Sequence, residues 1–472
     1  MGRGWAVILA ATLLAGGLGY AWWTRKARTV QALYLEPESP ESWPGLGPAE
    51  RDGLLAMAQD AAELDPRITV LLEAPPAGTG RPFEVLKLRA GRQGDALSLS
   101  FRDFQGHLTH AEGVPLEVLQ RLFQGRGLRV EALPRLFPRD PAAFWELAAL
   151  SSPFTFPELA SRRNRAQALA RAHPDSAAAW YRSAYLKLRL LIVEASEQAD
   201  AHLACDEDFR RALETLPDFP RALHQYSRYK SDIGAAREAL DLALRFRDRF
   251  PRHPLAYGAL AYAARNAGLL EGARKALEAR QTLVGGLLAD PGLGENTYLY
   301  LGDLDAFERS LDAGPGATFN PLRVFYRGYA RLLRGDRAGA LALFREAQRQ
   351  PGRTIQFEGL ARIYELALSG REAEAGQGLQ KLQDERTRIR IPDGEFTFKL
   401  AEAFAFLGNY GEAINTASLA FAQGFSCTRW YRTAPFLGPL QELPRWHSLL
   451  RHVQDREDLL ARSYPPGRFG RG

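Results

Sequence analysis

The side chains in this sequence best suited to holding a metal ion are two histidines and a run of acidic residues. His107 and His110 form the segment HLTH, a spacing that suits a pair of metal ligands. Because no third ligand follows nearby, we expect two solvated residues at the end of a strand. Residues 206–208 (Asp-Glu-Asp) precede Phe209. We expect them in the first turn of a helix, where the helix dipole favours negative charge.

The sequence offers no nucleophile in a recognisable catalytic setting. Its two cysteines, Cys205 and Cys427, exclude a disulfide framework and a zinc site built from cysteine thiolates. We expect Cys205 to be a core thiol, and nothing local indicates that Cys427 is activated. The phosphate-binding loop, the nucleophile elbow of serine hydrolases and the HEXXH motif of metalloproteases are all missing. We therefore predict no enzyme, no cofactor and no metal.

Length and composition are those of a folded protein of several domains. The chain has 472 residues, of which 46% are hydrophobic and 25% charged. A net charge of +6 is small for this length and does not by itself indicate nucleic acid. The excess of arginine over lysine, together with abundant alanine, glycine and proline, indicates a GC-rich bacterium.

The N-terminus carries a candidate membrane span. Residues 5–23 (WAVILAATLLAGGLGYAWW) contain no charge and are long enough to cross a hydrocarbon core of about 30 Å. Trp22 and Trp23 suit an interfacial belt, and the basic residues in 24–28 end the run. We predict an uncleaved transmembrane helix over residues 1–28 that contacts the lipid bilayer through residues 5–23. The alternative is a cleaved signal peptide, which normally has a shorter apolar core and small residues at its end.

Residues 29–135 alternate as a small α/β domain. Strand patterns cover residues 30–35, 67–73, 83–90 and 97–101, and helical patterns cover 49–64 and 114–123, in the order β-α-β-β-β-α. The segments ALYLEP, AERDGLLAMAQ, RITVLLEAP and VLKLRAGRQGDALSLSFRDFQGHLTH give residues 30–130 a resemblance to the TolB-like N-terminal module. In some bacterial regulators, that module stands between a membrane span and helical repeats.

From about residue 155 the sequence repeats with a period near 34. Glycines recur at positions 234, 268, 302, 335, 370 and 408. Such a period is typical of stacked helical pairs, which bury their apolar faces only by stacking. The clearest copy is residues 327–351, which carry Gly328, Gly335, Ala340, Phe344 and Ala347. Here the chain resembles the tetratricopeptide repeat (TPR) family. We therefore predict a mainly α fold, with a TPR-type α-solenoid over residues 136–425 and a capping segment and flexible tail over 426–472.

The TPR resemblance implies a concave groove lined by the first helix of each pair. In that frame a peptide partner would meet a basic end and an aromatic middle, with arginines on carboxylates and rings as apolar anchors. The predicted groove residues are Arg221, His224, Arg228, Tyr262, Arg265, Phe325, Tyr329, Tyr364 and Phe398. The alternative is that several of these rings pack against neighbouring repeats. Interleaved basic and aromatic residues also suit single-stranded nucleic acid, but the membrane tether leads us to predict no nucleic-acid partner.

The function we expect is a membrane-anchored protein-interaction scaffold or adaptor, part of a bacterial envelope signalling or regulatory system. In the regulators that carry the TolB-like module the repeats face the periplasm, so we expect an inner-membrane protein with a periplasmic body. The positive charges that follow the span favour the cytoplasm instead. Two alternatives stay open: an envelope biogenesis or secretion factor that chaperones clients through its repeats, and an enzyme accessory subunit or cryptic hydrolase.

Overall fold

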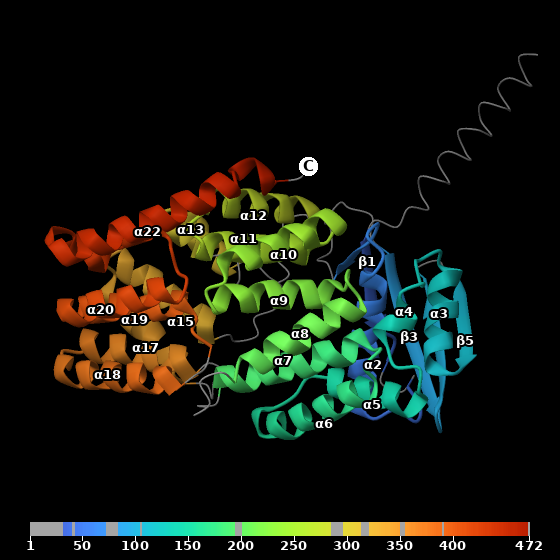
Figure 1. Cartoon of the computed structure of the whole chain (residues 1–472). Coiled ribbons are helices and arrows are strands. Elements are labelled where there is room, and N and C mark those ends of the chain that lie inside the picture. The colour runs from blue at the N-terminus through green and yellow to red at the C-terminus, as the bar shows by residue number, and fades with distance from the viewer. Residues whose placement is uncertain are drawn as a thin grey trace, which may run out of the picture.

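The computed structural model describes residues 32–39, 43–71, 84–103, 106–193, 201–284, 296–312, 321–349, 355–388 and 391–470 (Figure 1). The predicted anchor over residues 1–28, with its proposed lipid contact at 5–23, lies outside these residues. Within the described ranges, no helix is both long enough and apolar enough to span a bilayer.

The α/β domain is built on one mixed sheet of five strands. They are β1 (Ala32–Pro37), β2 (Thr69–Leu71), β3 (Glu84–Gln93), β4 (Ala96–Arg102) and β5 (Leu108–Gly113), in the spatial order β2-β1-β3-β4-β5. Strand β1 pairs in parallel with β2 and β3, while β3, β4 and β5 run antiparallel. The register places Leu88 opposite Phe101 and Phe101 opposite Thr109.

Among the described residues, helices cover one face of this sheet. Leu97, Leu99 and Phe101 alternate along β4 onto the covered face and are fully buried. Helices α2 (Pro48–Glu63) and α3 (Pro115–Gly125) lie there, and the ring of Phe101 packs edge-on against Phe123 of α3 at 5.3 Å. The alternation read from the sequence therefore identified this core correctly.

Strand β5 is a correction to the predicted order β-α-β-β-β-α, which lacked it. The segment that contains His110 pairs with β4 at the edge of the sheet. It buries Ala111, whereas Leu108 is 58% exposed. An edge strand that contributes so little to the core carries no alternating apolar pattern, so hydrophobicity alone could not reveal it.

The helical part begins directly against the α/β domain. After α4 (Leu133–Leu136), helix α5 (Pro141–Ser151) packs on α2 at Gly53, where an added Cβ would lie 1.6 Å from the carbonyl oxygen of Ala148. One apolar core continues from the sheet into the helices through Leu277, and it also includes Ile391, Leu460, Tyr464 and Phe469. The boundary predicted at residues 135 and 136 stays a prediction.

Among the described residues, seven consecutive helical pairs follow α6 (Leu159–Ala172), and they confirm the predicted solenoid of stacked pairs (Figure 1). The pairs are α7 (Ala177–Val193) with α8 (Leu203–Thr215), α9 (Pro220–Asp232) with α10 (Ala236–Arg249), α11 (Pro254–Asn266) with α12 (Leu270–Val284), α13 (Asn296–Tyr300) with α14 (Leu304–Asp312), α15 (Pro321–Leu333) with α16 (Arg337–Ala347), α17 (Ile355–Leu368) with α18 (Glu372–Arg388), and α19 (Gly394–Phe406) with α20 (Tyr410–Ala422).

The recurring glycines end the first helix of six of these pairs. Gly335 has φ +81°, and the N–H of the next residue, Asp336, donates back to the carbonyl of Arg331 at 3.0 Å. All six glycines have φ between +75° and +82°, and the same backbone bond recurs after each. This is the left-handed helix cap in which glycine avoids the strain of a side chain. The glycines therefore recur about every 34 residues because each one ends the first helix of a pair.

The solenoid closes on itself. The N–H of Asp393, just before α19, donates to the carbonyl of Asp232 at the end of α9 (2.7 Å), and Ser426 donates to Asn266 at the end of α11 (2.9 Å). A Cβ added to Gly424 would lie 2.4 Å from the Cα of Gly234. Helix α11 is buried throughout, and every residue of α19 except Phe406 is buried. Helix α19 is therefore an internal element that packs against earlier pairs, whereas its partner α20 keeps an exposed face.

The C-terminal segment covers both halves of this closed array. Helix α21 (Thr428–Thr433), the 3₁₀ helix η3 (Pro435–Glu442) and α22 (Pro444–Ser463) follow α20, and α22 extends from α20 to the side of α12 (Figure 1). Leu440 and Trp446 are fully buried, and Phe469 lies over Gly272 of α12. The capping role of this segment stays a prediction.

Candidate functional site

The two histidines of HLTH do not converge with other metal ligands. His107 lies 3.2 Å from the Oδ2 of Asp103. His110, on β5, lines a hollow of about 560 Å³ on the open face of the sheet, together with Arg89 and Glu112. No group of three or more metal-ligating side chains occurs among the described residues.

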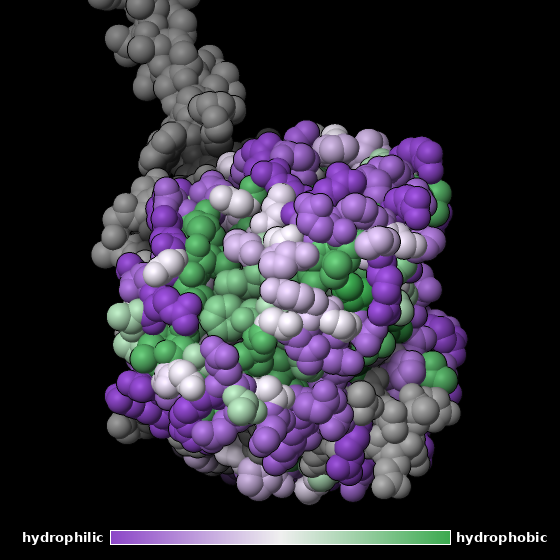
Figure 2. All heavy atoms as spheres, turned by 90° about the vertical axis from the view of Figure 1, so that its left-hand side faces the viewer, coloured by the Kyte–Doolittle hydropathy of each residue, from purple (hydrophilic) through white to green (hydrophobic). Residues whose placement is uncertain are grey.

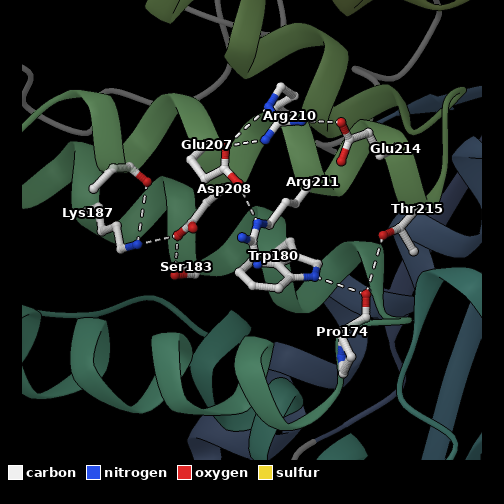
Figure 3. A network of polar contacts seen from close by, with 11 residues as sticks. Pro174, Trp180, Ser183, Lys187, Glu207, Asp208, Arg210, Arg211, Glu214 and Thr215 are labelled. Atoms are coloured by element: carbon white, nitrogen blue, oxygen red, sulfur yellow. Dashed lines mark hydrogen bonds and ion pairs between the residues drawn. The ribbon is translucent and has the colours of Figure 1, made fainter.

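The acidic run 206–208 lies on α8, where Asp206 alone of the three falls in the predicted first turn; Glu207 and Asp208 lie in the second turn, and Asp208 joins α8 to α7 (Figure 3). Asp208 is buried and accepts from the Nζ of Lys187 (2.5 Å) and from the Oγ of Ser183 (2.6 Å), both on α7. Glu207 instead contacts Arg210 and Arg211 on the exposed side of its own helix. The run therefore stabilises a helical pair.

Both cysteines are buried thiols. Burial raises the pKa of Cys205 to about 12, and it also raises the pKa of Cys427 well above its usual range. Because only a thiolate is a good nucleophile, neither residue is poised to react at neutral pH.

The aromatic residues of the predicted groove are covered by the chain itself. Phe325 and Tyr329 of α15, Tyr364 of α17 and Phe398 of α19 are at most 1% exposed. Tyr364 stacks on Phe344 at 5.2 Å, and Phe398 lies 4.3 Å from Tyr431, both distances joining ring centroids. These rings fill the spaces between repeats, which agrees with the alternative that several of them pack against neighbouring repeats. Their role in binding a peptide stays a prediction.

Part of the covering comes from the C-terminal segment. The ring of Phe436, on η3, lies 6.0 Å from Tyr329, 6.3 Å from Tyr364 and 5.0 Å from Phe406. The hydroxyl of Tyr329 donates to Glu402 of α19 at 2.8 Å. The segment thus lies where the aromatic middle of the groove was expected.

Buried charges on α19 complete the interior, and sequence reasoning missed them. Glu395 accepts from the Nη2 of Arg265 on α11 (2.6 Å) and from the hydroxyl of Tyr300 (2.6 Å). Lys399 pairs with Glu402 at 2.8 Å, and both side chains are almost fully buried. The signal was present in the sequence: three charges at helical spacing interrupt an otherwise apolar α19, which indicates partners inside the protein.

The basic end of the predicted groove meets the α/β domain. Arg221 of α9 lies 2.9 Å from Glu63 and 3.1 Å from Asp60, both on α2. Burial raises the pKa of Asp60 to about 6. Although burial opposes it, Arg221 holds the pKa of Glu63 below its usual value. Arg221 thereby joins the two parts of the chain.

His224, Arg228 and Tyr262 lie further along the same inner surface. His224 and Arg228 are half-buried on α9. The Tyr262 ring is contacted by Arg228 at 5.0 Å and by Arg265 at 4.8 Å, and its hydroxyl donates to Asp232 at 2.5 Å. The structure therefore brings the basic members of the predicted site together on α9 and α11, and Arg265 connects them to α19 through Glu395.

These features define the class of the protein as a closed solenoid of helical pairs with an α/β domain at its N-terminal side. No protein-family model matches the chain, and no curated protein matches its sequence. Two solved structures are similar to it at low identity: an APC/C hetero-tetramer, Cut9–Hcn1, and the TPR domain of P58(IPK).

The first likeness has 13% identity and a TM-score of 0.34, and it covers 71% of this chain and 65% of the other. The second has 16% identity and a TM-score of 0.18, and it covers 65% of this chain and 95% of the other. At these scores neither likeness carries an argument about function. The fold assignment rests on the helical pairs themselves.

Proposed function

We propose that this protein is an interaction scaffold that docks a protein partner on the apolar surface of its C-terminal repeats. The last residues of α15, α17 and α19 (Leu333, Leu368 and Phe406) are half-buried apolar side chains, and Phe436 lies beside Phe406. Figure 2 shows apolar side chains gathered in a hollow on the side of the molecule where α18, α20 and the start of α22 lie. Apolar surface of this kind commonly marks a protein interaction site.

The predicted groove is the less accessible of the two surfaces. Arg265, Phe325, Tyr329, Tyr364 and Phe398 are covered by the chain's own side chains. A peptide would contact them only after the last repeat pair had moved away. The apolar surface of the C-terminal repeats needs no such opening, so we propose that a partner first contacts the protein there.

The surroundings of the protein are a further part of this proposal. We propose that residues 5–23 anchor the chain in a bacterial inner membrane, that residues 30–130 form a TolB-like module, and that the body lies in the periplasm. Four of the six net positive charges fall within residues 1–28. The rest of the chain is therefore close to neutral, which argues against a nucleic-acid partner, since phosphate binding needs an excess of cations.

Site-specific photo-crosslinking tests the docking surface. A photoreactive phenylalanine analogue at Leu368, expressed in the native host, should give one dominant covalent adduct with a second protein. The matched control is the same analogue at Glu278, an exposed residue of α12. An adduct pattern that is equal at the two positions, or no adduct at Leu368, would contradict the proposal.

Reporter fusions test the proposed topology separately. Alkaline phosphatase fused to the C-terminus is active only outside the cytoplasm, so the proposal expects activity in the membrane fraction. A fluorescent C-terminal fusion without phosphatase activity would place the body in the cytoplasm.

A further inference from the structure

One arginine inside the solenoid, Arg280 of α12, has no counter-charge among the described residues. It is 1% exposed, and its Nε and Nη2 atoms have no hydrogen-bond partner in that part of the chain. It makes no ion pair within the part of the chain that the structure describes. A buried and unpaired guanidinium costs several kcal/mol. Native structures rarely keep such a group without a bound water or ion.

The surroundings of Arg280 direct it toward the inner surface of α9 and α11. A Cβ placed on Gly258 of α11 would lie 3.7 Å from the Nη1 of Arg280, so the guanidinium lies across this glycine. One turn further along α11, Tyr262 contacts the guanidinium of Arg228. The Nε of Arg228 likewise has no hydrogen-bond partner.

Arginines outnumber carboxylates on this surface, where Asp232 lies near Arg228 without forming an ion pair with it. Arg221 is neutralised by Asp60 and Glu63 of α2, but no carboxylate forms an ion pair with Arg228 or Arg280 among the described residues. Burial, together with the neighbouring Arg228 and Arg221, holds the pKa of His224 well below its usual range, and Arg280 contributes in the same direction. A neutral His224 can donate one hydrogen bond to an anion without adding a further charge.

We propose that Arg280, Arg228 and His224 form a binding site for a small oxyanion, a phosphate or a carboxylate, enclosed by α9, α11 and α12. Planar guanidinium groups bind both anions by two parallel hydrogen bonds. Because α19 and the seam at Asp393 close the solenoid beside this site, a compact ligand suits it better than an extended peptide. The site therefore adds a small-molecule ligand to a protein otherwise proposed to bind a protein partner.

Thermal unfolding in different anions tests this site on the full chain. Wild-type protein, Arg280→Met and Arg274→Met are compared in chloride, sulfate, phosphate and citrate at matched ionic strength. Arg274 lies on the same helix but is exposed and paired with Glu271, so it is the matched control. Sulfate and phosphate also stabilise proteins generally by exclusion from their surface, and the Arg280→Met variant measures that background.

We expect a saturating rise in Tm, on the order of 3 °C, in the wild type and in Arg274→Met but not in Arg280→Met. Saturation by sulfate and phosphate alone assigns a phosphate-like ligand, whereas saturation by citrate alone assigns a carboxylate. In chloride, Arg280→Met should unfold at a higher temperature than the wild type, because the unpaired charge is gone. A non-saturating rise that is equal in all three proteins would overturn the site.

If Arg280→Met does not fold, Arg228→Met takes its place, because the half-buried Arg228 tolerates substitution more readily. It should lose the same saturating response, and retention of the full response would overturn the site. No partner protein takes part in these measurements. Their failure would therefore leave the proposed scaffold function untouched, and failure of the crosslinking test would leave the anion site untouched.

Discussion

The ion pair between Arg265 and Glu395 provides the most informative perturbation of the closed solenoid. It joins α11 to α19 at 2.6 Å, with both side chains less than a tenth exposed. We predict that Arg265→Met alone is strongly destabilising, because it leaves Glu395 buried with its charge uncompensated.

The expected magnitude follows from the remaining contacts of Glu395. Breaking a buried pair by removing one partner typically costs about 3–5 kcal/mol. The hydroxyl of Tyr300 and the side-chain amide of Asn296 still donate to Glu395, at 2.6 Å and 2.8 Å. These two bonds retain part of the stabilisation, so we expect a loss near the lower end, about 3 kcal/mol.

The assay is a double-mutant cycle by urea unfolding with Arg265→Met, Glu395→Gln and the double variant. A direct pair should give a coupling free energy of about 2 kcal/mol. Arg274→Met, an exposed arginine, controls for the loss of an arginine in general and should change stability by less than about 0.5 kcal/mol. A coupling near zero, or equal losses for Arg265→Met and Arg274→Met, would refute the reasoning.

Three further measurements address other parts of the structure. Gly234→Ala should lower the free energy of unfolding more than Gly335→Ala. Both glycines have φ near +81°, but a Cβ at 234 would also lie 2.9 Å from the carbonyl oxygen of residue 423, where the solenoid closes. Equal losses of unfolding free energy would contradict this close contact. Burial and, to a smaller extent, the negative charge of the nearby Asp393 raise the pKa of Asp232 to about 7. Folding therefore takes up a proton, and stability falls as the pH rises from about 4 to 7. Asp232→Asn should flatten that fall and raise Tm at pH 8 relative to wild type, and an unchanged pH profile of Tm would show that Asp232 does not titrate in this range. Neither Cys205 nor Cys427 should react with a thiol reagent until the protein unfolds, and rapid reaction of the native protein would show that the thiols are accessible.

The solenoid was predictable from the sequence because the residues that end its helices are selected by local backbone conformation. A helix end that needs positive φ selects glycine wherever the end occurs, so the spacing of Gly335 and its counterparts reports the repeat directly. The alternation of apolar side chains along β4 is likewise visible within a few neighbouring residues. By contrast, β5 carries too little buried surface to leave an apolar pattern.

The closure of the solenoid was not predictable from the repeat pattern. That pattern states which face of each helix points inward, but it does not state what covers the inner face. Tyr329 and Tyr364 have the positions of groove residues in the repeat, yet Phe436 lies on them from a segment 70 or more residues further along the chain. The covering element becomes visible only when distant repeats are placed in space.

Hydrogen exchange of the backbone amides, resolved by peptide, tests the central claim that α19, the first helix of the last repeat pair, lies inside the solenoid. The burial of α19 predicts that residues 394–406 exchange as slowly as residues 254–266 of α11, and much more slowly than residues 372–388 of the outer helix α18. If residues 394–406 exchange as fast as residues 372–388, α19 is an ordinary outer repeat and the solenoid is open.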